Sequence, residues 1–308
     1  MLSIIDKHIP CLAEQLTAAG IEVLALEPED ITPAVVRHAQ ALFVRTRTNI
    51  NKELLDGSEV RFVATATIGT DHIDAAYCKQ RGITVASAPG CNAQAVCDYI
   101  EEALNEIGGS SLGIVGYGHV GKKVAAMAKA RGMKVIINDP PLGLDGDVTS
   151  CDVITFHTPL TSSGPFPTYH LCDAAFLRKC KSTAVIINAA RGGVVDEQAL
   201  LRSGHRFVLD TWENEPHLCP EVVNSKNCLL ASMHIAGYSL EGKINASQQC
   251  LDAFCLKFSF PSLIIDKFFV SLQAQTGDNA PGWLRRVSER LRQDPSKFEL
   301  LRKKYILR

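Results

Sequence analysis

The sequence predicts an α/β protein with two parallel-sheet domains and a small C-terminal α+β segment. Short apolar runs alternate with segments of helical periodicity through most of the 308 residues. Such alternation is typical of parallel sheets covered by helices. A glycine-rich turn joins one apolar run directly to one helical segment near the middle of the chain. After His234 the pattern changes to a long helical segment and a charged tail.

The elements can be placed in chain order from periodicity and from their flanking residues. The expected strands are residues 41–44, 61–66, 84–87, 112–115, 134–138, 153–156, 184–188 and 207–209. The expected helices are residues 50–55, 93–107, 120–131, 197–202 and 241–258, and the tail 283–308 with an interruption at Asp294-Pro295. Gly108-Gly109 ends the helix over 93–107, which separates the two α/β units.

Composition excludes several classes of protein. Hydrophobic residues make up 46% of the chain, enough for more than one core. The 32 basic and 33 acidic side chains nearly balance, so the basic footprint of a nucleic-acid-binding protein is absent. The 11 cysteines include no C-x-x-C pair, which favours reduced thiols over a zinc or disulfide framework. With no secretory signal or membrane-length apolar segment, we expect a cytoplasmic protein without a membrane partner. The basic end, Arg302-Lys303-Lys304, predicts a solvated helix terminus.

The glycine-rich turn predicts a Rossmann-like domain. The apolar run 112–115 leads into G-x-G-x-x-G, and an amphipathic segment follows at once. Glycines at these positions permit a tight turn and close approach of a pyrophosphate, and the first N–H groups of the helix are free to bind its phosphates. The residues expected at the cofactor here are Gly116, Gly118, His119, Val120 and Gly121.

An acidic residue specifies which dinucleotide is expected. Asp139 follows the second strand at roughly the 20-residue spacing of a ribose-binding carboxylate. A carboxylate there accepts hydrogen bonds from the ribose hydroxyls and repels a 2′-phosphate. Two prolines rather than an arginine come next. The expected cofactor is therefore NAD, with no metal.

Three later segments place polar side chains just after apolar strands, where they would face a ligand crevice. Arg191 lies beside a glycine pair, several carboxylates occupy residues 210–216, and His234 follows the next apolar run. A guanidinium can bind a carboxylate in bidentate fashion. Oxidation of an alcohol needs a base for the hydroxyl proton, and a carboxylate can orient and support that base.

These motifs resemble the D-isomer-specific 2-hydroxyacid dehydrogenases over roughly residues 1–255. The resemblance is carried by the glycine motif, Asn188-Ala-Ala-Arg191-Gly-Gly-Val-Val-Asp196, Asp210-x-Trp-x-x-Glu215-Pro216 and Met233-His234-Ile-Ala-Gly237. It implies that Arg191 binds and polarises the substrate, that Glu215 supports the histidine, and that His234 is the acid/base. Glu213 stands two residues from the family's catalytic position and is expected to be a surface carboxylate.

Further segments are similar to a branch of this family that oxidises a phosphorylated four-carbon 2-hydroxy acid in vitamin B6 biosynthesis. They include residues 44–48, 65–74, 88–93, 138–141, 156–160 and 234–243. This similarity implies substrate contacts from Thr46, Thr67 and Tyr238. It implies cofactor contacts from Asp139, Thr158, Asp210 and Gly237.

The residues themselves suggest where the substrate phosphate binds. Arg45 and Arg47 flank a strand-to-helix turn, a suitable place for a phosphate. Asp71-His72-x-Asp74 nearby is better explained by local helix capping than by a metal site.

The resemblance also implies the domain organisation. Residues 1–92 form a substrate-binding domain completed by a helix over about 240–256, residues 93–237 bind NAD, and residues 257–308 form a shortened dimerisation domain of a homodimer. Two alternatives remain open. One is a dehydrogenase for another D-2-hydroxy acid such as 3-phosphoglycerate, and the other is a non-catalytic, NAD-responsive binding module.

Overall fold

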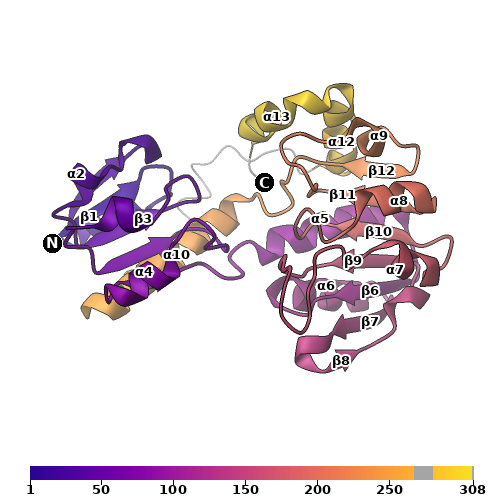
Figure 1. The fold of residues 1–308 in the computed structure, drawn as a ribbon, viewed down its shortest axis with the longest axis horizontal. Helices are drawn as coiled ribbons and strands as arrows, with labels where there is room; N and C mark the ends of the chain where they lie inside the picture. Colours follow the sequence, from indigo (N-terminus) through magenta and orange to yellow (C-terminus); the bar gives the residue numbers. More distant parts are fainter. Residues whose placement is uncertain (267–279, 307–308) are drawn as a thin grey trace. The chain divides into compact units, whose positions relative to one another are not determined.

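A computed structural model describes residues 1–266 and 280–306, which fall into two compact units. Residues 1–92 and 239–266 form the first unit, and residues 93–238 and 280–306 form the second. Each unit has its own β-sheet with helices packed on it (Figure 1). The predicted α/β class with two parallel-sheet domains is confirmed.

The first unit is built on a five-stranded, all-parallel sheet in the order β2-β1-β3-β4-β5. Its strands are β1 (Leu2–Asp6), β2 (Glu22–Leu26), β3 (Ala41–Val44), β4 (Phe62–Thr65) and β5 (Thr84–Ala86). Its helices are α1 (Leu12–Ala18), η1 (Pro28–Asp30), α2 (Pro33–Val36), α3 (Lys52–Leu55), α4 (Ala75–Gln80) and α10 (Leu240–Phe258).

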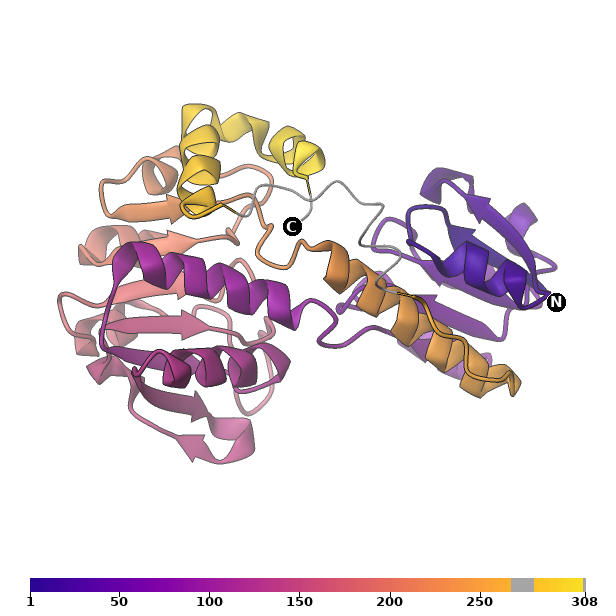
Figure 2. The same ribbon diagram turned by 180° about the vertical axis from the view of Figure 1, so that it is seen from behind.

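Helix α10 returns to the first unit from the far end of the sequence and covers one face of this sheet (Figure 2). The ring of Phe254 in α10 lies 5.6 Å from Phe43 and 5.9 Å from Phe62, centroid to centroid. Aromatic pairs at such distances add about 0.5–1.5 kcal/mol beyond the burial of their area. The strands β3 and β4 are buried along their whole length, as expected for a sheet covered on both faces.

The second unit is built on a seven-stranded sheet in the order β12-β11-β10-β9-β6-β7-β8, in which only β8 is antiparallel to its neighbour. Its strands are β6 (Ser111–Val115), β7 (Lys134–Asp139), β8 (Leu144–Asp145), β9 (Val153–Phe156), β10 (Val185–Asn188), β11 (Arg206–Leu209) and β12 (Cys228–Ala231). Its helices are α5 (Ala93–Ile107), α6 (His119–Ala130), η2 (Pro140–Leu142), η3 (Val148–Ser150), α7 (Ala174–Lys179), α8 (Glu197–Ser203), α9 (Pro220–Val223), α12 (Trp283–Gln293), η4 (Pro295–Lys297) and α13 (Phe298–Lys304).

The C-terminal helices belong to the second unit. Helix α12 packs against the edge strand β12, and the Ser288 hydroxyl accepts a 2.9 Å hydrogen bond from the backbone N–H of Ala231. Trp283 also packs edge-on against Tyr99 of α5 at 6.0 Å. The helical tail and its interruption at Asp294-Pro295 are as predicted. Residues 280–306 contain helices and no strand, so the β part of the predicted C-terminal α+β segment is not found in this range.

Every strand expected from the sequence is present within one residue of its predicted bounds. Three strands at or near sheet edges, β1, β2 and β12, were missed, together with the two-residue β8. Strand β2 lies at the edge of its sheet and has no buried residue, although four of its five residues are apolar.

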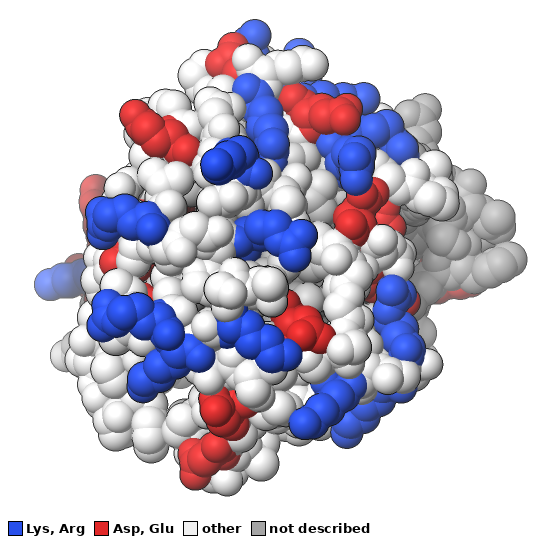
Figure 3. All heavy atoms as spheres, turned by 90° about the vertical axis from the view of Figure 1, so that its right-hand side faces the viewer, with Lys and Arg blue, Asp and Glu red and all other residues white. Residues whose placement is uncertain are grey.

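The surface charge and the character of the helices bear on whether the protein could bind nucleic acid or cross a membrane. On the face shown in Figure 3, Lys and Arg side chains are spread widely with Asp and Glu side chains among them. Across residues 1–266 and 280–306, no helix combines the length and apolar character needed to cross a membrane.

Candidate active site

The glycine turn connects β6 to α6 in the second unit, as the motif predicts. Gly116 has a φ of 92°, a conformation that favours glycine. A Cβ at Gly121 would overlap the carbonyl oxygen of Gly116, so only glycine lets the helix start this close to its strand. Gly118 precedes the helix with open space around it, and no side chain caps the first turn, which includes His119 and Val120. The first N–H groups of α6 are thus free to bind an anion.

A carboxylate lies directly beside this turn. Asp139 Oδ2 accepts a 2.6 Å hydrogen bond from the backbone N–H of Tyr117, within the glycine loop. This bond fixes the side chain at the end of β7, where the ribose of a dinucleotide is expected.

A threonine next to the glycine turn has a buried hydroxyl without a hydrogen-bond partner among the described residues. A Cβ at Gly116 would lie only 3.1 Å from Cγ2 of Thr158. The hydroxyl of Thr158 is buried and has no hydrogen-bond partner among the described residues. Buried hydroxyls normally have partners. These features together fit a bound dinucleotide: the glycine turn is open, the first N–H groups of α6 are free, Asp139 is held beside the turn, and the hydroxyl of Thr158 lacks a partner among the described residues.

Arg191 is exposed at the end of a tight turn after β10. Asn188 shapes this turn, because its side-chain oxygen accepts from the N–H of Ala190 (3.1 Å) and its amide donates to the carbonyl of Arg191 (2.9 Å). A Cβ at Gly192 would overlap the carbonyl oxygen of Trp212. The loop carrying the arginine therefore packs directly against the backbone that leads to the next predicted site residues.

The predicted acid/base pair is assembled. His234 Nδ1 lies 2.8 Å from Glu215 Oε2, and both side chains are largely shielded from solvent. Glu215 Oε1 accepts a 2.9 Å hydrogen bond from the backbone N–H of Trp212, which orients the carboxylate. If Nδ1–H donates to Glu215, Nε2 is left as the proton acceptor.

The loop around His234 is held by a buried carboxylate. Asp210 is 1% exposed and accepts from the Ser232 hydroxyl (2.6 Å), the Ile235 N–H (2.8 Å) and the Ala236 N–H (2.9 Å). Ser232 in turn lies 2.8 Å from the hydroxyl of Tyr99. These bonds hold the segment in which the histidine adopts a left-handed φ of 55° and which continues into Gly237 and Tyr238. Asp210, expected at the cofactor from resemblance, has both oxygens occupied within the protein.

Glu213 is not the free surface carboxylate that the sequence suggested. Its Oε1 accepts from His170 Nε2 at 2.7 Å and from the backbone N–H of Glu197 at 3.3 Å. Glu197 Oε1 accepts from the N–H of Glu213 at 2.7 Å, so the two backbone segments are joined by reciprocal bonds. Glu197 is 5% exposed, and burial together with the neighbouring carboxylates raises its pKa to about 7. The expectation failed because sequence spacing does not reveal a partner 43 residues away.

One cluster within residues 1–266 and 280–306 has side chains of the kind that bind a metal ion. His170, Asp196 and Glu213 offer ligand atoms within 4.8 Å of one another. Within the protein, Asp196 Oδ1 caps α8 through the N–H of Ala199 (2.8 Å), and Glu213 Oε1 lies 2.7 Å from His170 Nε2. Asp74, in the other segment considered, caps α4 through a 2.8 Å bond from Tyr77 N–H, which confirms the capping interpretation.

In the first unit, the predicted substrate residues follow β3 and β4. Arg45 donates to both carboxylate oxygens of the fully buried Asp6 at 2.7 and 3.1 Å. Two of its donors are therefore committed within the unit. Thr46 and Arg47 are exposed in the same turn. The Thr67 hydroxyl donates to the Gly69 carbonyl at 3.0 Å.

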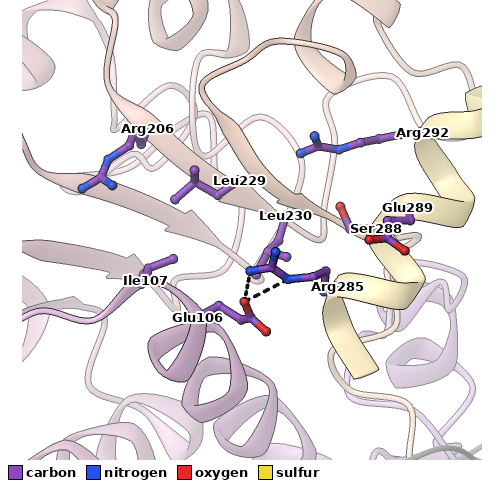
Figure 4. A pocket seen from close by; sticks show the side chains of 9 residues that line it. All are labelled: Glu106, Ile107, Arg206, Leu229, Leu230, Arg285, Ser288, Glu289 and Arg292. Carbon is purple, nitrogen blue, oxygen red and sulfur yellow. Dashed lines mark hydrogen bonds and ion pairs between the residues drawn. The ribbon is translucent and has the colours of Figure 1, made fainter. Parts of the chain in front are cut away.

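A cavity of about 340 Å³ lies elsewhere in the second unit, between α5, β12 and α12 (Figure 4). Across it, Arg285 of α12 pairs with Glu106 of α5. Arg292 donates to the backbone carbonyl of Cys228. None of its lining residues is among the site residues expected from the sequence.

Comparison with known proteins identifies the relatives of this chain. The family profile described as D-isomer specific 2-hydroxyacid dehydrogenase, NAD binding domain, matches residues 91–236. Erythronate-4-phosphate dehydrogenase of Bacteroides fragilis is 39% identical over 338 aligned positions, which cover 100% of this chain and 97% of the relative. The enzyme of the same name from Pseudomonas fluorescens is 40% identical over 96% of this chain and 80% of its own length.

Solved structures give the same fold. The NAD-bound 3-phosphoglycerate dehydrogenase of Entamoeba histolytica superposes with a TM-score of 0.69 at 23% identity, covering 86% of this chain and 99% of that one. The likeness at this level of identity concerns the fold alone.

Proposed function

This chain belongs to the D-isomer-specific 2-hydroxyacid dehydrogenase family, and from that premise we propose that it oxidises 4-phospho-D-erythronate to 3-hydroxy-2-oxo-4-phosphooxybutanoate with NAD. The single observation that carries the reaction is the 2.8 Å contact between His234 and Glu215 in the unit that holds the dinucleotide turn. Relatives named erythronate-4-phosphate dehydrogenase, 39–41% identical, support the substrate. The reaction belongs to pyridoxal 5′-phosphate (vitamin B6) biosynthesis.

The turn between β6 and α6 would hold the cofactor. The N–H groups at the start of α6 would bind its pyrophosphate, and Asp139 would accept hydrogen bonds from its ribose hydroxyls. We place Thr158 and Gly237 at the same cofactor. When bound, NAD accepts the hydride from C2 of the substrate.

Proton removal falls to His234. As the hydride leaves C2, the hydroxyl proton passes to Nε2 of the imidazole, and Glu215 stabilises the imidazolium through Nδ1–H. Asp210 acts by holding the histidine segment in place. Because its carboxylate is buried and occupied, we assign it this positioning role at the site.

Arg191 binds the substrate carboxylate and polarises the forming carbonyl. In the first unit, Thr46, Arg47 and Thr67 are the proposed substrate contacts, and Tyr238 is the proposed contact in the second. Arg45 was expected to bind the phosphate together with Arg47. Its pairing with Asp6 makes it mainly a support for that turn, and Arg47 the more available cation.

Turnover with a set of acids tests this function. Formation of reduced nicotinamide is followed with 4-phospho-D-erythronate, 3-phospho-D-glycerate and D-lactate at saturating NAD. Preference for the first by at least about ten-fold in kcat/KM supports the proposal. Preference for phosphoglycerate favours the alternative substrate, and NAD binding without turnover of any acid favours a binding module.

We also propose that the protein acts in the cytoplasm as a homodimer. Size-exclusion chromatography with light scattering distinguishes a dimer from a monomer, and fractionation of cells tests the location.

A further inference from the structure

The basic C-terminal cluster is not uniformly solvated, contrary to the sequence expectation. Lys303 and Lys304 are exposed, but the Arg302 side chain is only 27% exposed. Helical periodicity explains the difference, because Arg302 follows the fully buried Phe298 by one helical turn and shares its inward face. One of the three cations of this segment is thus directed into the second unit.

The surroundings of Arg302 belong to the candidate active site. Its guanidinium carbon lies 5.4 Å from the ring centroid of Tyr238, the residue directly after Gly237. It also interacts electrostatically with Glu215, the partner of His234. Arginine over a tyrosine ring is a favourable cation–π arrangement.

The partners of Arg302 within the protein do not use all of its donors. Its ion pair with Glu299 spans 3.4 Å on the helix surface, where the glutamate is 44% exposed, and such pairs contribute little. Its Nε is buried and has no hydrogen-bond partner within residues 1–266 and 280–306. A buried, unsatisfied N–H is costly and normally finds an acceptor. An anionic ligand would supply one.

The guanidinium of Arg302 carries a positive charge that a phosphate can neutralise. Burial opposes its positive charge, but Tyr238, Glu215 and Glu299 outweigh burial and raise the pKa of Arg302. The proposed substrate carries two anionic groups, a carboxylate next to the reacting carbon and a phosphate at the far end. Since Arg191 is assigned to the carboxylate, the phosphate has two candidate cations, the exposed Arg47 of the first unit and the largely buried Arg302 of the second.

We propose that Arg302 binds the phosphate of the substrate beside Tyr238 and so selects phosphorylated 2-hydroxy acids, a proposal that rests on the dehydrogenase function above. Planar arginine suits phosphate because two parallel N–H donors match two oxygens. The residue is a specificity determinant and takes no part in hydride or proton transfer.

The kinetic test compares 4-phospho-D-erythronate with D-erythronate, which lacks only the phosphate. We expect Arg302→Gln to lower kcat/KM for the phosphorylated acid by about 10- to 100-fold, mainly through KM, the loss typical of one charge-assisted hydrogen bond. D-Erythronate should change by less than about two-fold, because it makes no such bond. Arg302→Lys should lie in between. The matched control is Lys303→Gln, the exposed next residue, which should behave like the wild type.

Equal losses on both acids would overturn the proposal, since they would mean that Arg302 only positions Glu215. An unchanged KM for the phosphorylated acid would also overturn it. A binding measurement separates this result from failure of the proposed function. Calorimetric titration of the NAD-saturated protein with inorganic phosphate requires no turnover. Binding weakened at least about ten-fold in Arg302→Gln but not in Lys303→Gln supports the phosphate site even if neither acid is oxidised. Equal phosphate affinity in all variants refutes it.

Discussion

Replacing Glu197 by glutamine should make the stability of the second unit less sensitive to pH. Glu197 is 5% exposed, and burial with the nearby Glu213, Glu215 and Asp196 raises its pKa from 4.5 to about 7. Glutamine keeps the oxygen that accepts the backbone N–H of Glu213 but cannot ionise. The substitution therefore removes a buried charge while preserving the bond between the two segments.

The shift sets the size of the effect. The change from 4.5 to about 7 is roughly 2.5 units, and at about 1.36 kcal/mol per unit it corresponds to at most about 3 kcal/mol. Because the folded-state pKa is the higher one, Glu197 contributes its full stability below pH 4.5 and loses it as the pH rises through 7. Between pH 5 and pH 8, the wild type should lose up to about 2.5 kcal/mol relative to Glu197→Gln.

Urea unfolding at both pH values measures this difference. Both of the chain's 2 tryptophans, Trp212 and Trp283, lie in the second unit, so their fluorescence reports on it. The exposed Glu22→Gln is the control and should show the same pH dependence as the wild type. A difference between wild type and Glu197→Gln that stays the same at pH 5 and pH 8 would refute the reasoning.

Three further changes test the site. Glu215→Gln should lower kcat by about 10²–10⁴-fold, because the amide cannot stabilise the imidazolium of His234. The affinity for NAD, measured by titration, should not change. A loss of NAD affinity would contradict this role. Gly192→Ala should displace the loop after β10, because the new Cβ would overlap the carbonyl oxygen of Trp212. Turnover should be abolished, while circular dichroism shows a folded protein. A near-normal kcat would show that the loop adapts. Asp139→Asn should raise the KM for NAD about ten-fold and reduce the discrimination against NADP. An unchanged ratio of kcat/KM with NAD to kcat/KM with NADP would argue against recognition of the ribose by Asp139.

The site was predictable from the sequence wherever its geometry is local. The glycine turn and the caps depend on residues a few positions apart, so their spacing already specifies the conformation. The order of Arg191, Glu215 and His234 after successive strands predicted one ligand edge, because parallel strands end on the same side of a sheet.

Apart from the pair that the family motif implied, long-range partners could not be predicted, since packing decides them. Glu213 and Glu215 have the same charge and are two residues apart, yet one binds His170 and the other His234. The family motif predicted the partner of Glu215, but nothing in the residues around Glu213 predicts His170. The turn after β11 and the segments packed against it set the direction in which each side chain points. Asp210 was expected at the cofactor from the resemblance, but its three buried hydrogen bonds to Ser232, Ile235 and Ala236 were not predicted.

By itself, the sequence determined the α/β class, the NAD turn and the family, because each depends on short-range periodicity or on motif spacing. Only the tertiary structure decided which side of the basic tail is buried. Arg302 and Lys303 are adjacent and both cationic, and the docking of α13 on the second unit turns one toward Tyr238 and leaves the other in solvent. A helix places neighbouring side chains about 100° apart, so the surface that it packs against determines which charge becomes functional.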